Sequence, residues 1–371
     1  FAMSGDAITI RMTDLRTDDP SVSANFEMVF DTITGNSVLL GMDQPFENYS
    51  GNLVVGSLDA KFGFEDTNEN GSVVFSASAQ QLAVDTSMSL SDLDGLSNGN
   101  MSQFSKDSAL TVSYTLGPTL MAMDVSDPSD GTFRLDYQDA GTSFDFAFGK
   151  GQLDYGASVE GMALNFLMPR ELPFPFQTSI GRATSRITMP FAKNVEGPFQ
   201  FDTTLIDLTV ADGIWNLFDP GQILPRDPAS IDIQLSGLGK WYFDLMNPEE
   251  AMMMEQADIP GEISEVTIDA LSVDMLGVKA AGGGAFTFDW NDLRTFDGFA
   301  RPQGQARVLV EGANALIDKL ITMGVVSPQD AMGARMGIAM FSQPGETEDS
   351  LTSSIEINEL GNVLVNGQRI R

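Results

Sequence analysis

Short segments in which polar and apolar residues alternate fill most of the chain up to about residue 165. Clear examples are residues 7–12, 22–30, 72–79 and 132–137, with Gly, Asp and Asn between them. A period of two is the pattern of half-buried strands, and these small polar residues favour tight turns. The connections are too short for the crossover helices that parallel strands need, so we predict an antiparallel meander.

Strand, helix and hairpin signals agree best in residues 303–371. A strand pattern at 305–311 is followed by an apolar stripe at helical spacing, made of Leu316, Ile317, Leu320 and Ile321. Ser327 and Pro328 match the N-cap and first position of a second helix that runs to Phe341. We therefore predict a small helical cap over residues 313–341. Shorter helices are expected at 212–218 and after Asn247.

The alternating segments place large apolar residues on one face of the sheet, as in Phe144, Phe146 and Phe148. Such a face must be covered, and the predicted helices are too few to cover it. We predict a mainly β protein, with a large curved antiparallel sheet that forms a trough or a sandwich. A proline-rich connector at 168–176 suggests a boundary between residues 1–167 and 168–371, although one continuous elongated domain is equally compatible.

The charge and composition exclude several classes of function. A net charge of −32 disfavours binding to nucleic acid and to anionic membrane surfaces. The chain has no Cys and no His, which removes thiolate and imidazole catalysis and the metal sites that use those ligands. No apolar run reaches the roughly 20 residues of a transmembrane helix. The sequence opens at Phe1 without a Met, so a signal or anchor segment is expected to precede it.

A calcium site is the one metal site that the sequence suggests. Asp66, Asn68 and Asn70, followed by a Gly, match the opening of a calcium loop. The twelfth position of that loop is Ala77 instead of the usual bidentate Glu, and a hairpin turn uses the same residues. No pair of carboxylates is marked out by a catalytic motif. We therefore expect no enzymatic activity and, calcium aside, no cofactor.

A second candidate site is an apolar ligand surface. Met332, Met336 and Met340 share one helix face, and methionine repacks easily around lipids and other apolar ligands. Together with Phe144, Phe146 and Phe148 they are candidates for lining such a site. Ordinary core packing is the alternative.

Several segments of the second half resemble a known protein family. Residues 268–277, 285–288, 301–304, 316–320, 323–324, 332–336 and 365–369 are similar to the C-terminal half of domain-of-unknown-function family 2125. That family comprises exported bacterial envelope proteins, and the C-terminal ending is also similar to AsmA-like and YdbH-like envelope proteins. The resemblance implies a non-catalytic periplasmic protein that binds or escorts lipid in a β trough. The alternative is a structural or protein-interaction component of the envelope without a small ligand.

Overall fold

The computed structural model describes residues 2–16, 19, 21–40, 48–89, 108–129, 131–168, 170, 172 and 174–371. Over these residues, 19 strands form one antiparallel sheet, accompanied by 4 short helices. The prediction of a mainly β protein built on one large antiparallel sheet is confirmed. The polar break that the sequence shows at 91–104 lies outside the described residues.

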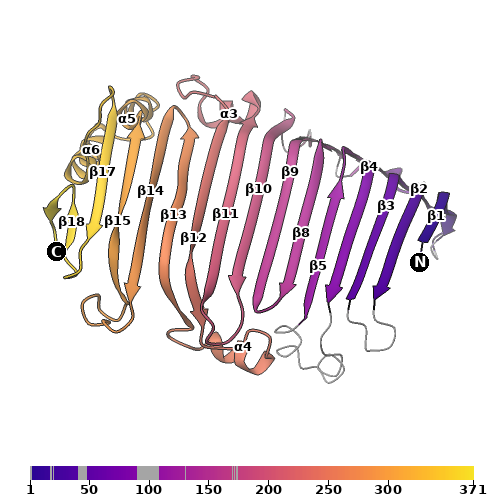
Figure 1. Cartoon of the computed structure of the whole chain (residues 1–371). Helices are drawn as coiled ribbons and strands as arrows, with labels where there is room; N and C mark the ends of the chain where they lie inside the picture. Colours follow the sequence, from indigo (N-terminus) through magenta and orange to yellow (C-terminus); the bar gives the residue numbers. More distant parts are fainter. Residues whose placement is uncertain are drawn as a thin grey trace.

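The strands lie across the sheet almost in the order of the chain (Figure 1). The first four are β1 (Ala2–Arg16), β2 (Val22–Leu40), β3 (Asn48–Asp66) and β4 (Gly71–Ser89). The next rows each consist of two short strands placed end to end. β5 (Ala109–Leu116) and β6 (Thr119–Asp127) both pair with β4, and β8 (Gly141–Gly149) and β7 (Gly131–Asp139) pair with them in turn. β9 (Gln152–Leu167) then pairs along both β7 and β8.

The second half continues the same sheet. Its long strands are β10 (Phe176–Pro190), β11 (Gly197–Val210), β12 (Ala229–Trp241), β13 (Gly261–Met275), β14 (Val278–Asp289), β15 (Arg301–Glu311) and β17 (Ser350–Ile357). Three short strands finish it, namely β16 (Gln343–Pro344), β18 (Val363–Val365) and β19 (Gln368–Arg369). β9 pairs with β10 along most of its length, so the sheet runs without a break past the boundary proposed at residue 168.

The helices that the structure describes lie at the ends and margins of the sheet, not over its faces (Figure 1). They are α3 (Asp212–Phe218), α4 (Pro248–Met254), α5 (Ala313–Thr322) and α6 (Pro328–Phe341). The predicted N-caps are confirmed, since Asn247 accepts from the Glu249 amide and Ser327 from the Asp330 amide. α5 and α6 lie at the end of the sheet formed by β15 and β17, and the apolar stripe of α5 is half-buried. Within the described residues, every helix is too short or too polar to span a membrane.

A straight row of irregular residues crosses the strands from β1 to β11, and we call it the bend line. It consists of Asp6, Thr32, Gly56, Gln81, Gly117, Ala140, Gly161, Gly181 and Asp207. The regular pairs on both sides of the row keep one register, as in Asp31–Ser57 and Ile33–Val55. Irregularities of this kind bend a sheet locally. The strands of the N-terminal half accordingly turn back at one end (Figure 1).

Residues with positive backbone angles lie beside glycines at several places along the bend line. Thr32 has a φ of 51° and Asp207 a φ of 55°, in the left-handed region that side chains rarely adopt. A Cβ on Gly56 would stand 3.2 Å from the Cβ of Thr32, and a Cβ on Gly181 would stand 3.2 Å from that of Asp207. Each glycine thus leaves room for an irregular residue on the neighbouring strand, which fixes the bend at this row.

The alternation of apolar residues shifts by one position at the bend line. Phe30 and Ile33 on β2 are three residues apart, as are Val159 and Met162 on β9, yet each pair lies on one face. The irregular residue between them compensates for the shift. One face of the sheet is therefore apolar on both sides of the bend, and the other face is polar.

We expect Gly161→Ala to cost about 1–2 kcal/mol of unfolding free energy, the usual penalty for a side chain in the left-handed region. Gly161 has a φ of 57°, and a Cβ there would lie 3.2 Å from the Cβ of Ala140. Gly156→Ala on the same strand is the matched control, because its nearest neighbour would be 3.8 Å away. Urea unfolding of both variants checks this, and equal stability would show that the bend does not depend on Gly161.

Candidate functional site

The bend line divides this part of the sheet into two panels. We name them the β6–β7 panel and the β5–β8 panel after the short strands on each side of the line, and the apolar face extends over both. On the β6–β7 panel it is formed by Phe26, Met28, Phe30, Phe62, Phe75, Met121, Met123, Phe133, Leu135, Tyr137, Leu164 and Phe166. On the β5–β8 panel it is formed by Leu53, Val84, Leu110, Val112, Tyr114, Phe144, Phe146, Phe148, Tyr155 and Ile187. Cross-strand neighbours on one face of a sheet are in contact range, so these residues form a continuous apolar surface.

The aromatic rings on this face pack in pairs. Phe144 meets Tyr155 at a centroid distance of 5.2 Å, and Phe148 stacks on Phe191 at 4.7 Å. The predicted ligand-lining residues Phe144, Phe146 and Phe148 therefore lie together on the apolar face. Met332, Met336 and Met340 do not join them, because they are exposed on α6 at the far end of the sheet. Their exposure also excludes the alternative of ordinary core packing.

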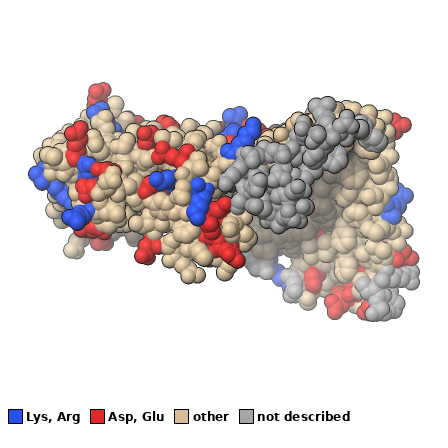
Figure 2. Space-filling view, turned by 60° about the horizontal axis from the view of Figure 1, so that its bottom comes forward, with Lys and Arg blue, Asp and Glu red and all other residues tan. Residues whose placement is uncertain are grey.

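The apolar face is the inside of the bend. Next to the bend line, the side chains on this face are buried: Ile33, Val55, Ala79, Thr119 and Asp139. On β6, Leu120 follows the buried Thr119 and points to the opposite face, where it is 57% exposed. Figure 2 shows a hollow on the N-terminal side of the molecule.

The whole chain exposes much more surface than a compact protein of its size. Its accessible surface is 22017 Å². The size scaling of compact monomers gives about 14,000 Å² for a mass of 40.0 kDa. Among the residues that the structure describes, neither a second sheet nor a layer of helices covers the apolar face of the single sheet, and the excess follows from that. Most residues of that face are consequently half-buried.

Charged residues occupy the outer, polar face. Salt bridges there join Arg134 to Asp136 at 3.0 Å, Arg182 to Glu160 at 2.6 Å and Arg186 to Asp154 at 3.0 Å. Hydrogen bonds to Arg134 and Asn165, with the Arg134 charge, lower the pKa of Asp136 against the opposing effect of partial burial. In each of these pairs both charged groups lie on the outer face.

Asp139 is an exception, because it lies on the apolar face beside the bend line. It is 6% exposed, and its Oδ1 has no hydrogen-bond partner. Tyr137 is its neighbour on the same face. Burial raises the pKa of Tyr137 to about 12, with a hydrogen bond to Asp139 and its charge adding to the effect. Burial also raises the pKa of Tyr114, across the bend line, and the charge of Asp139 contributes.

Asp139→Asn is expected to lower the pKa of Tyr137 without returning it to the usual value of about 10, because burial is the larger cause. The pKa of the folded state lies above that of the unfolded state. The neutral phenol therefore stabilises the fold fully below about pH 10, and that stability is lost as the pH rises through about 12. Absorbance titration of the 5 tyrosines measures this. Tyr242, also at about 12, is the internal control, and an unchanged Tyr137 would contradict the contact.

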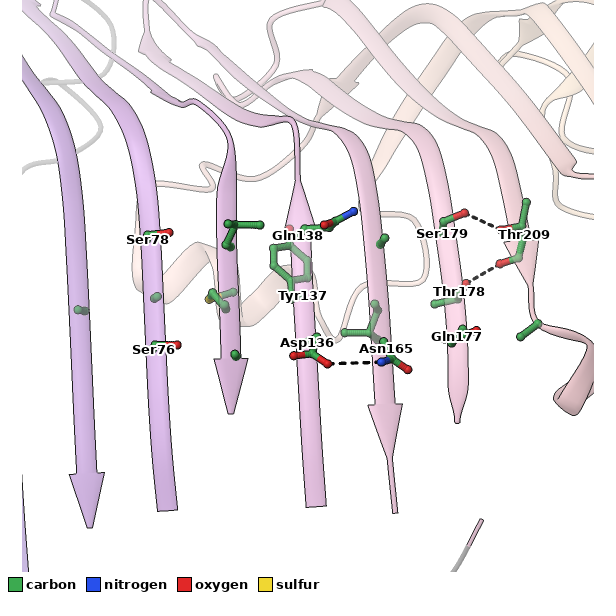
Figure 3. A pocket seen from close by; sticks show the side chains of 18 of the residues that line it. Ser76, Ser78, Asp136, Tyr137, Gln138, Asn165, Gln177, Thr178, Ser179 and Thr209 are labelled. Carbon is green, nitrogen blue, oxygen red and sulfur yellow. Dashed lines mark hydrogen bonds between the residues drawn. The ribbon is translucent and has the colours of Figure 1, made fainter. Parts of the chain in front are cut away.

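A polar pocket of about 870 Å³ lies on the outer face of the β6–β7 panel (Figure 3). Its side chains come from alternate positions on seven neighbouring strands, and they are mostly hydroxyls and amides. Asn165 donates to Asp136 at 3.4 Å, and the hydroxyls of Ser179 and Thr209 lie 2.5 Å apart. The pocket satisfies much of its hydrogen bonding internally.

The calcium candidates Asp66, Asn68 and Asn70 lie in the hairpin turn between β3 and β4. The carboxylate of Asp66 accepts from the amides of Asn68 at 2.8 Å and of Glu69 at 3.2 Å. Asn70 has a φ of 54°, which asparagine tolerates in turns. These contacts are those of the hairpin turn that the sequence offered as the alternative. Over the part of the chain that the structure describes, no three acidic side chains gather in a metal-binding group.

Sequence reasoning missed Asp139, Tyr114 and Tyr137. A signal was present, because β7 places Phe133, Leu135, Tyr137 and then Asp139 on alternating positions. A carboxylate at the apolar phase of a strand is unusual. Whether this carboxylate is buried or exposed depends on the bend of the sheet, which the sequence pattern does not show.

A scan against models of protein families gave no match to this chain, and a search of curated proteins found no matching protein. The resemblance of the C-terminal segments to domain-of-unknown-function family 2125 therefore stays a prediction.

Proposed function

We propose that the protein is a non-catalytic carrier that binds an apolar or amphipathic ligand, such as a lipid, on the concave apolar face. The observation that carries the proposal is a continuous apolar surface on the inside of a bent sheet, left half-exposed. Soluble monomers rarely expose contiguous apolar patches of this extent unless they bind something there. We place this function in the bacterial periplasm, as the C-terminal resemblance implies.

The physical gain from binding is the removal of two apolar surfaces from water. Each methylene of an acyl chain contributes about 0.8 kcal/mol when fully buried. In a homologous series of ligands, affinity should therefore rise up to about fourfold with each added methylene. Rings and methionines suit this role, because Met side chains repack around ligands of different shape.

Native mass spectrometry of protein purified without detergent tests the proposal. We expect adducts with the masses of lipids, which extraction into organic solvent removes. Displacement of the neutral fluorophore N-phenylnaphthylamine by alcohols of increasing chain length measures the binding. Protein that carries no adduct and shows no dependence on chain length would contradict a carrier function.

The alternative is a structural or protein-interaction role in the envelope. The observation that favours it is the outer side of α6, where Met332, Met336 and Met340 are exposed. Met336→Lys places a charge in the middle of that stripe and leaves the apolar face untouched. Loss of a protein partner in this variant, with ligand binding unchanged, would support the alternative.

A further inference from the structure

Asp139 combines deep burial, an apolar setting and an unused acceptor atom. Its side chain occupies the first position beside the bend line, opposite Thr119 on β6. The hydroxyl of Thr119 donates to the carbonyl of Gly117 at 3.2 Å and so does not serve the carboxylate. Oδ1 of Asp139 is left without a hydrogen-bond partner.

No basic side chain faces Asp139 among those described on β1 to β10. The Lys and Arg side chains that the structure describes on these strands occupy outer-face positions, and they are Arg11, Lys61, Arg134, Arg182 and Arg186. None of the ion pairs among the described residues includes Asp139. A buried carboxylate that lacks a cation and a full set of donors is unfavourable, and a donor from elsewhere relieves that cost.

We infer that Asp139, with Tyr137 and Tyr114 beside it, anchors the polar end of the ligand. This inference rests on the proposed carrier function and names its ligand class: an amphipathic molecule whose head group donates hydrogen bonds. A primary ammonium satisfies the site best, because it supplies both donors and the missing positive charge. A hydroxyl supplies one donor. A carboxylate head group is rejected, because it would meet a like charge.

The neighbours of Asp139 allow a head group to reach it. The β7–β9 ladder ends at Gln138–Ala163, one residue before Asp139 and Met162, and Met121 of β6 pairs with Tyr137. Both methionines can change rotamer at little cost. With the head group at the bend line, the chain of the ligand lies along the rings of either panel.

Three probes of equal chain length separate the head groups: dodecylamine, dodecanol and dodecanoate. Each displaces N-phenylnaphthylamine from the full chain at neutral pH and physiological ionic strength. In the unaltered protein we expect the amine to bind at least about tenfold more tightly than the carboxylate, with the alcohol between them. In Asp139→Asn this preference should shrink to less than about threefold, while binding of the alcohol persists.

Asp145→Asn is the matched control, because it removes the same charge from the outer face, where Asp145 accepts from Ser113. It should keep the full preference for the amine. If Asp139→Asn does not fold, Tyr137→Phe is the second variant, and we expect it to lose part of the preference for the amine over the carboxylate. Equal binding of all three probes by the unaltered protein overturns the inference and leaves the carrier function intact. Equal losses in the Asp139 and Asp145 variants also overturn it, and binding of none of the probes overturns the carrier function itself.

Discussion

Two carboxylates placed on the concave face should weaken N-phenylnaphthylamine binding by more than about tenfold, because a ligand would have to bury them. The variant is Ile10→Glu with Leu53→Glu. Ile10 pairs with Met28 and Leu53 with Val84, so both lie on the apolar face, where they are 45% and 36% exposed. Substitutions at such partly exposed positions change stability little, so the loss should appear in binding and not in folding.

The matched control is Val74→Glu with Leu120→Glu, which adds the same two charges to the outer face. Both residues are exposed, and both alternate with the apolar positions of β4 and β6. This pair should leave the affinity for the fluorophore within about twofold of the original. Circular dichroism confirms that both variants are folded. Similar affinities in the two double variants would mean that the probe does not bind on the concave face.

The sequence was sufficient to predict the kind of fold. Alternation with period two identifies strands, and Ser327 with Pro328 identifies the start of α6 from local chemistry alone. The bend line was not predicted, because Thr32 and Gln81 are ordinary residues whose positive φ depends on their neighbours. The one-position shift between Phe30 and Ile33 is visible in the sequence. It indicates a bend only when the strand pairing shows that the other strands shift at the same row.

The candidate site was predicted in part for the same reason. Periodicity places Phe144, Phe146 and Phe148 on one face, and the structure locates them there. It also places Met332, Met336 and Met340 on one helix face, but it cannot say whether that face meets the sheet or the solvent. Asp139 needed the most context, because it is buried at the bend line, and the position of that line depends on the pairing of many strands.

Phe191→Ala should cost about 3–5 kcal/mol of unfolding free energy, the range for a fully buried Phe that leaves a cavity. Phe191 is 2% exposed and follows β10, where its amide donates to the carbonyl of Gly151 at 2.9 Å. Its ring stacks on Phe148 with a centroid distance of 4.7 Å, which closes this end of the apolar face. Urea unfolding measures the loss.

Phe299→Ala is the control, because the same ring is removed from a site that is 79% exposed. It should change the free energy of unfolding by less than about 0.5 kcal/mol. A loss below about 1 kcal/mol for Phe191→Ala would mean that neighbouring side chains move into the space left by the ring. The end of the apolar face at Phe191 would then be able to repack, as we propose for the rest of that face.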